Sequence, residues 1–200
     1  MIKKTLILLL ILQSCATAYD EIFVLIKNQS LGYPNQLITL ASFEAAEYSF
    51  ATFKVGRNPK VKLVLSSIKN NVYQWVSSDM HMVYTYNGLI IKTSGLPHNI
   101  YLREFREFNP LQSNNLKPIL EFDKPALVGM PIALEFDSIK EASDTNIYSN
   151  IVSYTYFREA SLIGWKAVDE YWFSDGMAIY SKQKIHPDLP KVEMEFFYKF

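Results

Sequence analysis

Two short motifs carry residue types used by enzymes that form an acyl-serine intermediate. Ser66–Lys69 reads SSIK and matches S-x-x-K, and Lys92–Gly95 reads KTSG, close to the K-T-G element of serine β-lactamase-like enzymes. That chemistry needs the serine at the start of a helix packed on a separate sheet, with an S-D-N element between the two motifs. This chain has no S-D-N, little sequence between the motifs, and a predicted strand end at the serines. We therefore expect no serine nucleophile here.

The other titratable residues form no recognisable catalytic or metal-binding pattern. His81, His98 and His186 are the three histidines, and no pair has the spacing typical of metal ligands. Glu193 and Glu195 share one face of a predicted strand, which favours a solvated sheet face over acid–base chemistry. The hydrolase, zinc-protease and phosphate-loop motifs are absent from the sequence. We predict no catalytic residue, no metal site and no cofactor, and hence a protein that is not an enzyme.

Aromatic side chains are the remaining candidates for ligand contact. Trp75, Trp165 and Trp172 could stack on sugar rings together with tyrosines, although packing in a β-sheet core is the favoured interpretation. From this group we retain Tyr84, Tyr86 and Trp172 as candidates for contact with a glycan or a partner protein.

The sequence begins with a pattern that predicts lipid modification. Lys3 and Lys4 precede an apolar run, Thr5–Leu12, which is too short to span a bilayer at the roughly 20 residues required. The following residues, Leu12–Cys15, read LQSC and resemble the bacterial lipobox, with cleavage between Ser14 and Cys15 and acylation of Cys15. The alternative is a plain secretory signal that ends near Ala16–Ala18 and discards the cysteine. Since Cys15 is the single cysteine of the chain, we favour lipidation.

Lipidation would fix the location and the extent of the mature protein. Acyl chains on Cys15 would hold it at the membrane as an anchored, non-spanning protein. No aspartate follows the cysteine to indicate inner-membrane retention, so we expect the outer membrane, on its periplasmic face. Residues 1–14 are then the signal peptide, and residues 15–200 form one β-rich lipoprotein domain.

Composition and patterning predict a mainly β fold. The chain has 200 residues, 20 basic and 20 acidic side chains, and no charge excess that would favour nucleic acid. Short apolar runs separated by turn signals predict a single antiparallel β-sandwich or partly open barrel of about ten strands. We expect one or two short N-terminal helices, at Glu21–Lys27 and Leu37–Ala46. We predict one strand over Val128–Phe136 and one over Ile147–Arg158. Ala160–Val168 and Glu170–Phe173 are predicted as two further strands, separate from each other.

A β-hairpin is the clearest local prediction. Asn87-Gly88 suits the type I′ turn, which needs positive φ at both central positions, and residues 83–86 and 89–93 flank it as strands. Asp175-Gly176 repeats this pattern near the C-terminus. In this interpretation Ile179 corresponds to Ile91, Ser181 to Thr93, and Trp172 to Trp75.

These segments also carry a resemblance to a known family. Cys15, the segments Tyr48–Gly56 and Gly88–Leu96 (G-x-I-x-K-T-x-G-L), and the string from Tyr171 to Pro190 (W…S-x-Q…P-x-L-P) resemble the YjbF/GfcB (YmcC) family of bacterial lipoproteins. The resemblance implies a β-rich fold and a non-catalytic role in assembly or export of a capsule polysaccharide or exopolysaccharide. It also implies an outer-membrane β-barrel exporter and a periplasmic companion as partners. The alternative is a periplasmic carrier that holds a lipid or other hydrophobic ligand inside a half-open barrel.

Overall fold

The computed structural model describes residues 38–199, in which one antiparallel sheet carries most of the chain. A short helix, α2 (Leu40–Glu44), precedes the sheet, and its first turn is capped by the Thr39 hydroxyl, which accepts from the Ser42 N–H at 3.2 Å. The thirteen strands are β1 (Phe50–Val55), β2 (Val61–Lys69), β3 (Val72–Val76), β4 (Met82–Tyr86), β5 (Leu89–Ser94), β6 (Ile100–Arg103), β7 (Ile119–Asp123), β8 (Ala126–Pro131), β9 (Ala133–Glu141), β10 (Val152–Ala160), β11 (Trp165–Ser174), β12 (Met177–Gln183) and β13 (Val192–Phe197).

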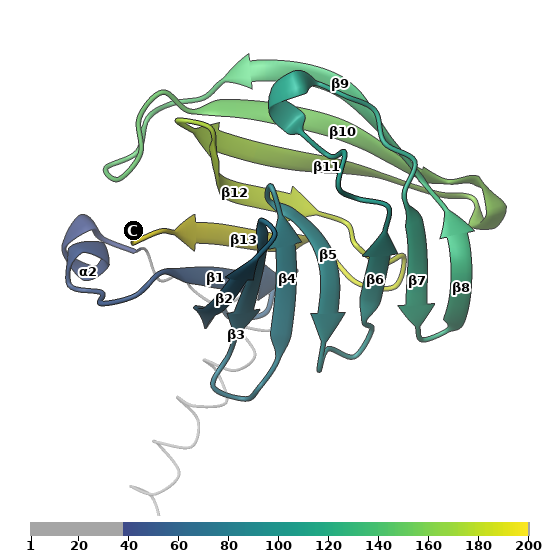
Figure 1. Ribbon diagram of the computed structural model, residues 1–200, viewed down its shortest axis with the longest axis horizontal. Helices are drawn as coiled ribbons and strands as arrows, with labels where there is room; N and C mark the ends of the chain where they lie inside the picture. Colours follow the sequence, from purple (N-terminus) through teal and green to yellow (C-terminus); the bar gives the residue numbers. More distant parts are fainter. Residues whose placement is uncertain (1–37, 200) are drawn as a thin grey trace, which may run out of the picture. The chain divides into compact units, whose positions relative to one another are not determined.

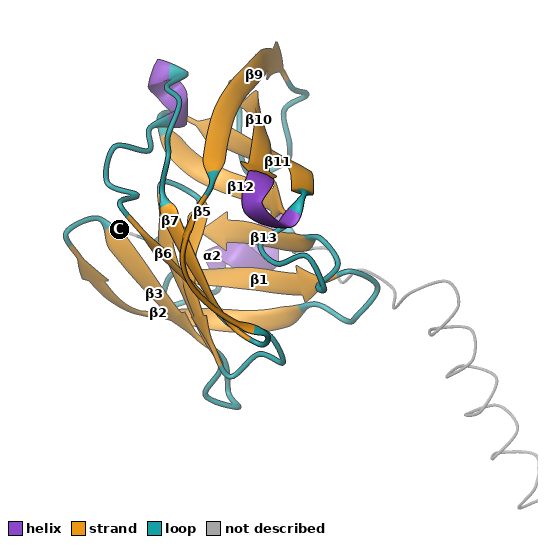
Figure 2. Ribbon diagram, turned by 90° about the vertical axis from the view of Figure 1, so that its right-hand side faces the viewer, coloured by secondary structure: helices purple, strands orange, loops and turns teal. Residues whose placement is uncertain are grey.

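Strands that are consecutive in the sequence are mostly neighbours in the sheet. The first and last strands pair with each other, and two strands from the middle of the chain form the edges. The order in the sheet is β8-β7-β6-β5-β4-β3-β2-β1-β13-β12-β11-β10-β9, so β1 pairs with β13 while β8 and β9 stand at the two edges. Figures 1 and 2 show the two walls, β2–β8 and β9–β13 with β1, curving around a common interior. An isolated antiparallel bridge pairs Leu116, which precedes β7, with Leu134 of β9. The predicted mainly β, partly open barrel is confirmed, but the sheet has thirteen strands where about ten were expected.

Strand boundaries differ from the prediction at three points. The run Val128–Phe136 is divided between β8 and β9 at Pro131, and Pro131 lies in an edge strand, as proline requires. Residues Ser161–Ile163 form a 3₁₀ helix, and β11 is then continuous from Trp165 to Ser174. The segment Ile147–Val152 is mostly loop. The expected helix at Leu37–Ala46 is confirmed as α2, whereas Glu21–Lys27 lies outside the described residues.

The two predicted hairpins are equivalent in detail. Asn87 and Gly88 have φ of 47° and 78°, and Asp175 and Gly176 have 50° and 82°, so both turns have positive φ at both central positions. In each hairpin the second pair from the turn is followed by a bulge, which leaves Ile91 unpaired in β5 and Ile179 unpaired in β12.

The shared register changes one proposed correspondence. In β4 the residue paired beyond the bulge is Tyr84, opposite Lys92, and in β11 it is Trp172, opposite Tyr180. The counterpart of Trp172 is therefore Tyr84, and the predicted correspondence with Trp75 is wrong. Trp75 lies on β3, fully buried, where its Nε1–H donates to the Thr85 hydroxyl at 2.9 Å.

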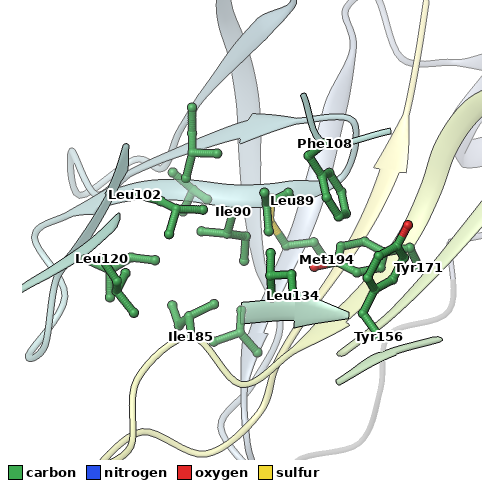
Figure 3. Packing of buried hydrophobic residues seen from close by; sticks show 14 of the residues in the cluster. Leu89, Ile90, Leu102, Phe108, Leu120, Leu134, Tyr156, Tyr171, Ile185 and Met194 are labelled. Atoms are coloured by element: carbon green, nitrogen blue, oxygen red, sulfur yellow. The ribbon is translucent and has the colours of Figure 1, made fainter. Parts of the chain in front are cut away.

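Side chains from both walls fill the interior between them. The ring of Phe108, from the loop after β6, packs against the rings of Tyr156 and Tyr171 (Figure 3). The ring centroids are 5.4 Å and 5.2 Å apart, respectively. Ile185, from the connection between β12 and β13, belongs to the same cluster as Leu120 and Leu134. This aromatic and aliphatic packing fixes which residues of each strand point outward, and those outward residues form the candidate site.

Candidate functional site

The candidate site is a pocket on the outer face of β11, β12 and β13. Along β11, Tyr171 and Phe173 are buried in the core, so Trp172 between them points to the opposite face. Trp172 pairs with Tyr180 of β12, which pairs in turn with Glu195 of β13. The rings of Trp172 and Tyr180 meet edge to face with centroids 4.7 Å apart. An aromatic pair and a carboxylate thus form the floor of the pocket.

The loop between β9 and β10 forms one wall. Thr145 holds its tip, because its hydroxyl accepts from the Tyr148 N–H at 2.9 Å and its own N–H donates to the Tyr148 carbonyl at 2.8 Å. The Tyr148 hydroxyl reaches across to β13 and donates to the Phe196 carbonyl at 2.8 Å. These bonds keep the loop over the sheet instead of extending into solvent.

The segment that leads into α2 forms the opposite wall. Phe43 of α2 packs against Phe197 with centroids 6.1 Å apart, and Phe197 stacks on Phe50 at 4.7 Å. The pocket so enclosed has a volume of about 560 Å³, within the range of small-ligand sites. Its lining comprises Ile38, Thr39, Leu40, Lys60, Ala142, Ser143, Thr145, Asn146, Ile147, Tyr148, Ile151, Trp172, Ile179, Tyr180, Glu195 and Phe197.

The charged groups of the pocket are paired. Lys60 Nζ lies 2.6 Å from Glu195 Oε1, and the Thr52 hydroxyl donates to Glu195 Oε2 at 3.1 Å. Contacts with both a cation and a hydroxyl group fix this carboxylate in position. Glu195 is therefore suited to accept a hydrogen bond from a ligand hydroxyl group.

The two tyrosines of the pocket stay protonated at neutral pH. Burial raises the pKa of Tyr148 to about 12. Burial also raises the pKa of Tyr180, and the neighbouring carboxylates of Glu193, Glu195 and Glu170 raise it further. Both phenols therefore remain hydrogen-bonding hydroxyl groups at physiological pH.

The structure separates the aromatic residues predicted to contact a ligand. Trp172 lines the pocket, whereas Tyr84 and Tyr86 project from β4, outside the pocket lining. Tyr84 lies beside Lys92, whose Nζ is 5.3 Å from its ring centroid, and the Tyr86 hydroxyl donates to the Arg106 carbonyl at 3.0 Å. Ser14 and Cys15, the predicted processing site, lie outside the described residues.

Sequence reasoning missed most of the pocket. Glu193 and Glu195 do share the outer face of β13, as the alternation predicted, with Val192, Met194 and Phe196 buried on the other side. Glu193 Oε1 lies 3.7 Å from Lys182 Nζ of β12, so this pair makes the outer face charged. The signal that could have identified Tyr180 is the hairpin register, which places it opposite Trp172. No comparable signal marks Tyr148 or the segment before α2, because loop packing brings them in.

The comparisons with known proteins identify the family. The described residues form a β-rich domain with a pocket on the outside of its sheet, and none of their helices has the length and apolarity to cross a bilayer. Residues 31–197 match the model of the family described as group 4 capsule polysaccharide lipoprotein gfcB, YjbF. The chain belongs to this family of lipoproteins, which confirms the resemblance read from the sequence. No curated protein matches the chain.

A solved structure shares the fold. It is the crystal structure of the hypothetical lipoprotein YmcC from Escherichia coli (K12), with a TM-score of 0.63 and 15% sequence identity. The similarity covers 83% of this chain and 99% of the other chain. The family connects the protein with capsule polysaccharide and with lipoproteins of the cell envelope, and its description names no enzymatic activity.

Proposed function

We propose that this protein is a non-catalytic outer-membrane lipoprotein that assists assembly or export of a capsule polysaccharide or exopolysaccharide by binding a segment of the glycan in the outer pocket. The single observation that carries the binding role is the pocket itself, where Trp172 and Tyr180 present aromatic surface beside the fixed carboxylate of Glu195. Membership of a capsule polysaccharide lipoprotein family supports the biological context.

The pocket has the mixed chemistry that a sugar ring requires. The C–H face of a pyranose packs against aromatic rings, and its hydroxyl groups need donors and acceptors at the edge of that contact. Trp172 and Tyr180 supply the aromatic surface, Glu195 supplies an acceptor, and the exposed side chain of Asn146 supplies both donor and acceptor groups. At about 560 Å³ the site suits a short segment of a chain rather than a long stretch of it.

The anchor and the partners complete the proposal. Acyl chains on Cys15 would hold the protein on the periplasmic face of the outer membrane, next to an outer-membrane β-barrel exporter and a periplasmic companion protein. Replacing Cys15 with Ser should then release the protein from the membrane fraction. Retention of Cys15→Ser in that fraction, at the level of the unaltered chain, would contradict anchoring through this residue.

A direct binding measurement tests the pocket. Oligosaccharide fragments of the surface polysaccharide made by the protein's own cell should bind the full chain, as followed by calorimetry and tryptophan fluorescence. Trp172→Ala should weaken this binding at least tenfold, a loss of about 1.4 kcal/mol. Tyr84→Ala is the matched control, since Tyr84 occupies the equivalent hairpin position but lies outside the pocket lining. Equal affinities for the two variants would contradict a glycan site here.

The apolar part of the lining favours one alternative ligand. Ile38, Ile147 and Ile179 line the same pocket, as do Ile151 and Phe197. These side chains suit an acyl chain, as a carrier of hydrophobic ligands would require, although this pocket lies outside the sheet rather than within its interior. Binding of a fluorescent fatty acid that glycan fragments do not displace, and that Trp172→Ala weakens, would favour the carrier.

A further inference from the structure

Two histidines and one carboxylate from distant parts of the sequence meet at one end of the sheet. His98 lies in the loop between β5 and β6, and His186 and Asp188 lie in the connection between β12 and β13. One nitrogen or oxygen atom from each residue lies within 4.8 Å of the other two. The two imidazole rings are 4.7 Å apart between centroids. Spacing along the sequence gives no indication that His98 and His186 meet, and the fold brings their rings together.

A backbone carbonyl fixes the orientation and the tautomer of His98. Its Nδ1 lies 2.8 Å from the carbonyl oxygen of Lys124. Since a carbonyl oxygen can accept but not donate, Nδ1 of the neutral ring carries the proton and Nε2 carries the free lone pair. A histidine that donates one ring N–H to a backbone carbonyl and offers the other nitrogen is the usual arrangement of a metal-binding histidine.

His186 presents its own lone pair toward Asp188. Its Nδ1 accepts from the Asp188 N–H at 3.0 Å and lies 4.0 Å from Asp188 Oδ2. The proton of the neutral ring is consequently on the buried Nε2, and a zinc ion at Nδ1 would replace the hydrogen bond from the Asp188 N–H. The ring is fully buried, and the aromatic ring of Phe122 packs edge to face against it at 4.3 Å.

We propose that His98, His186 and Asp188 form a zinc-binding site. Two imidazoles and one carboxylate are ligands that suit Zn²⁺, with water in the fourth tetrahedral position. Zinc–ligand bonds of about 2.0–2.2 Å place neighbouring ligand atoms roughly 3.4 Å apart, so the three side chains must close on the ion. The Asp188 side chain is 58% exposed, so its carboxylate is free to rotate toward the two imidazole rings.

Zinc at this position would join two parts of the sheet that do not pair directly. It would link the loop between β5 and β6, in one wall, to the connection between β12 and β13, in the other. The β7–β8 hairpin would participate through the Lys124 carbonyl that orients His98. Because only the folded chain brings the three ligands together, bound zinc should raise the unfolding temperature.

The test is a zinc titration of the full chain, purified in detergent through a tag without histidine. We expect one zinc ion per chain by calorimetry and metal analysis, and a rise of several degrees in the unfolding midpoint. His98→Ala and Asp188→Asn should each weaken zinc binding at least tenfold, while keeping the circular-dichroism spectrum of the parent chain. Both residues are solvent-accessible, so their replacement tests the site without opening the core.

His81→Ala is the matched control, because His81 is the one histidine outside the cluster. It should bind zinc with the stoichiometry and affinity of the parent chain. Absence of zinc binding by the parent chain at micromolar concentrations would overturn the proposal. Zinc binding that is lost in His81→Ala, or that persists unchanged in His98→Ala, would overturn it as well.

Discussion

The side-chain nitrogen Nε2 of Gln183 donates to the carbonyl oxygen of Gly88 at 2.8 Å. Its Oε1 accepts from the Ile90 N–H at 3.0 Å, and all of these contacts are buried. Gln183 ends β12, whereas Gly88 lies in the turn between β4 and β5, so one side chain connects the hairpins of the two walls. Two of the sequence segments that carry the family resemblance, G-x-I-x-K-T-x-G-L and S-x-Q, therefore meet through these hydrogen bonds.

Truncating the Gln183 side chain should destabilise the protein more than truncating an exposed glutamine does. Gln183→Ala leaves the Gly88 carbonyl and the Ile90 N–H buried without this partner, and we expect a loss of roughly 2–4 kcal/mol in the free energy of unfolding. Urea denaturation followed by tryptophan fluorescence measures the loss. Gln112→Ala, an exposed glutamine in a 3₁₀ helix, should change stability by less than about 0.5 kcal/mol. Similar losses for both variants would show that Gln183 does not connect the walls.

The two equivalent glycines allow a second prediction. Gly88 and Gly176 occupy the same turn position with nearly equal φ, but a Cβ on Gly88 would lie 2.9 Å from the Ala178 Cβ, whereas one on Gly176 would meet nothing closer than 3.9 Å. Gly176→Ala should cost about 1–2 kcal/mol, the cost of a left-handed conformation for a non-glycine residue. Gly88→Ala should cost about 1–3 kcal/mol more, because it also overpacks the contact between the walls. Equal unfolding midpoints for the two variants would contradict this close approach.

The features predicted correctly from the sequence are those decided by neighbouring residues. Asn87-Gly88 and Asp175-Gly176 specify their turns through their own backbone preferences, and alternation along β13 identifies its buried side. Errors arose where tertiary context decides. Leu162 is apolar yet 74% exposed in a 3₁₀ helix, so the apolar pattern suggested a strand where the chain turns.

The sites depend on contacts that local sequence does not encode. Trp172 is recognisable as outward-facing between two inward aromatic residues, but Tyr148 reaches the pocket through a loop hydrogen bond to β13. His98 and His186 meet because the connection between β12 and β13 crosses to the other wall and buries Ile185 in the shared core. Contacts of this kind depend on residues far apart in the chain, so they leave no local pattern in the sequence.

A buried ion pair provides the last prediction. Arg158 of β10 contacts Asp169 of β11, with Nε at 2.7 Å and Nη2 at 2.6 Å from Oδ2, and both side chains are fully buried. The other carboxylate oxygen of Asp169 accepts from the Lys184 N–H at 2.8 Å. Asp169→Ala should destabilise the protein by about 3–5 kcal/mol, since it leaves a buried guanidinium without its counter-charge.

Removing both charges distinguishes this mechanism from a simple loss of packing. The double variant Arg158→Met with Asp169→Leu should be more stable than Asp169→Ala by at least about 2 kcal/mol, because no unpaired charge is left in the core. The exposed pair of Lys166 and Glu159, 3.3 Å apart, is the control, and Glu159→Ala should cost less than about 1 kcal/mol. Urea denaturation of all three variants gives the comparison. If the double variant unfolded as readily as Asp169→Ala, the cost would come from lost packing and hydrogen bonds rather than from the buried charge.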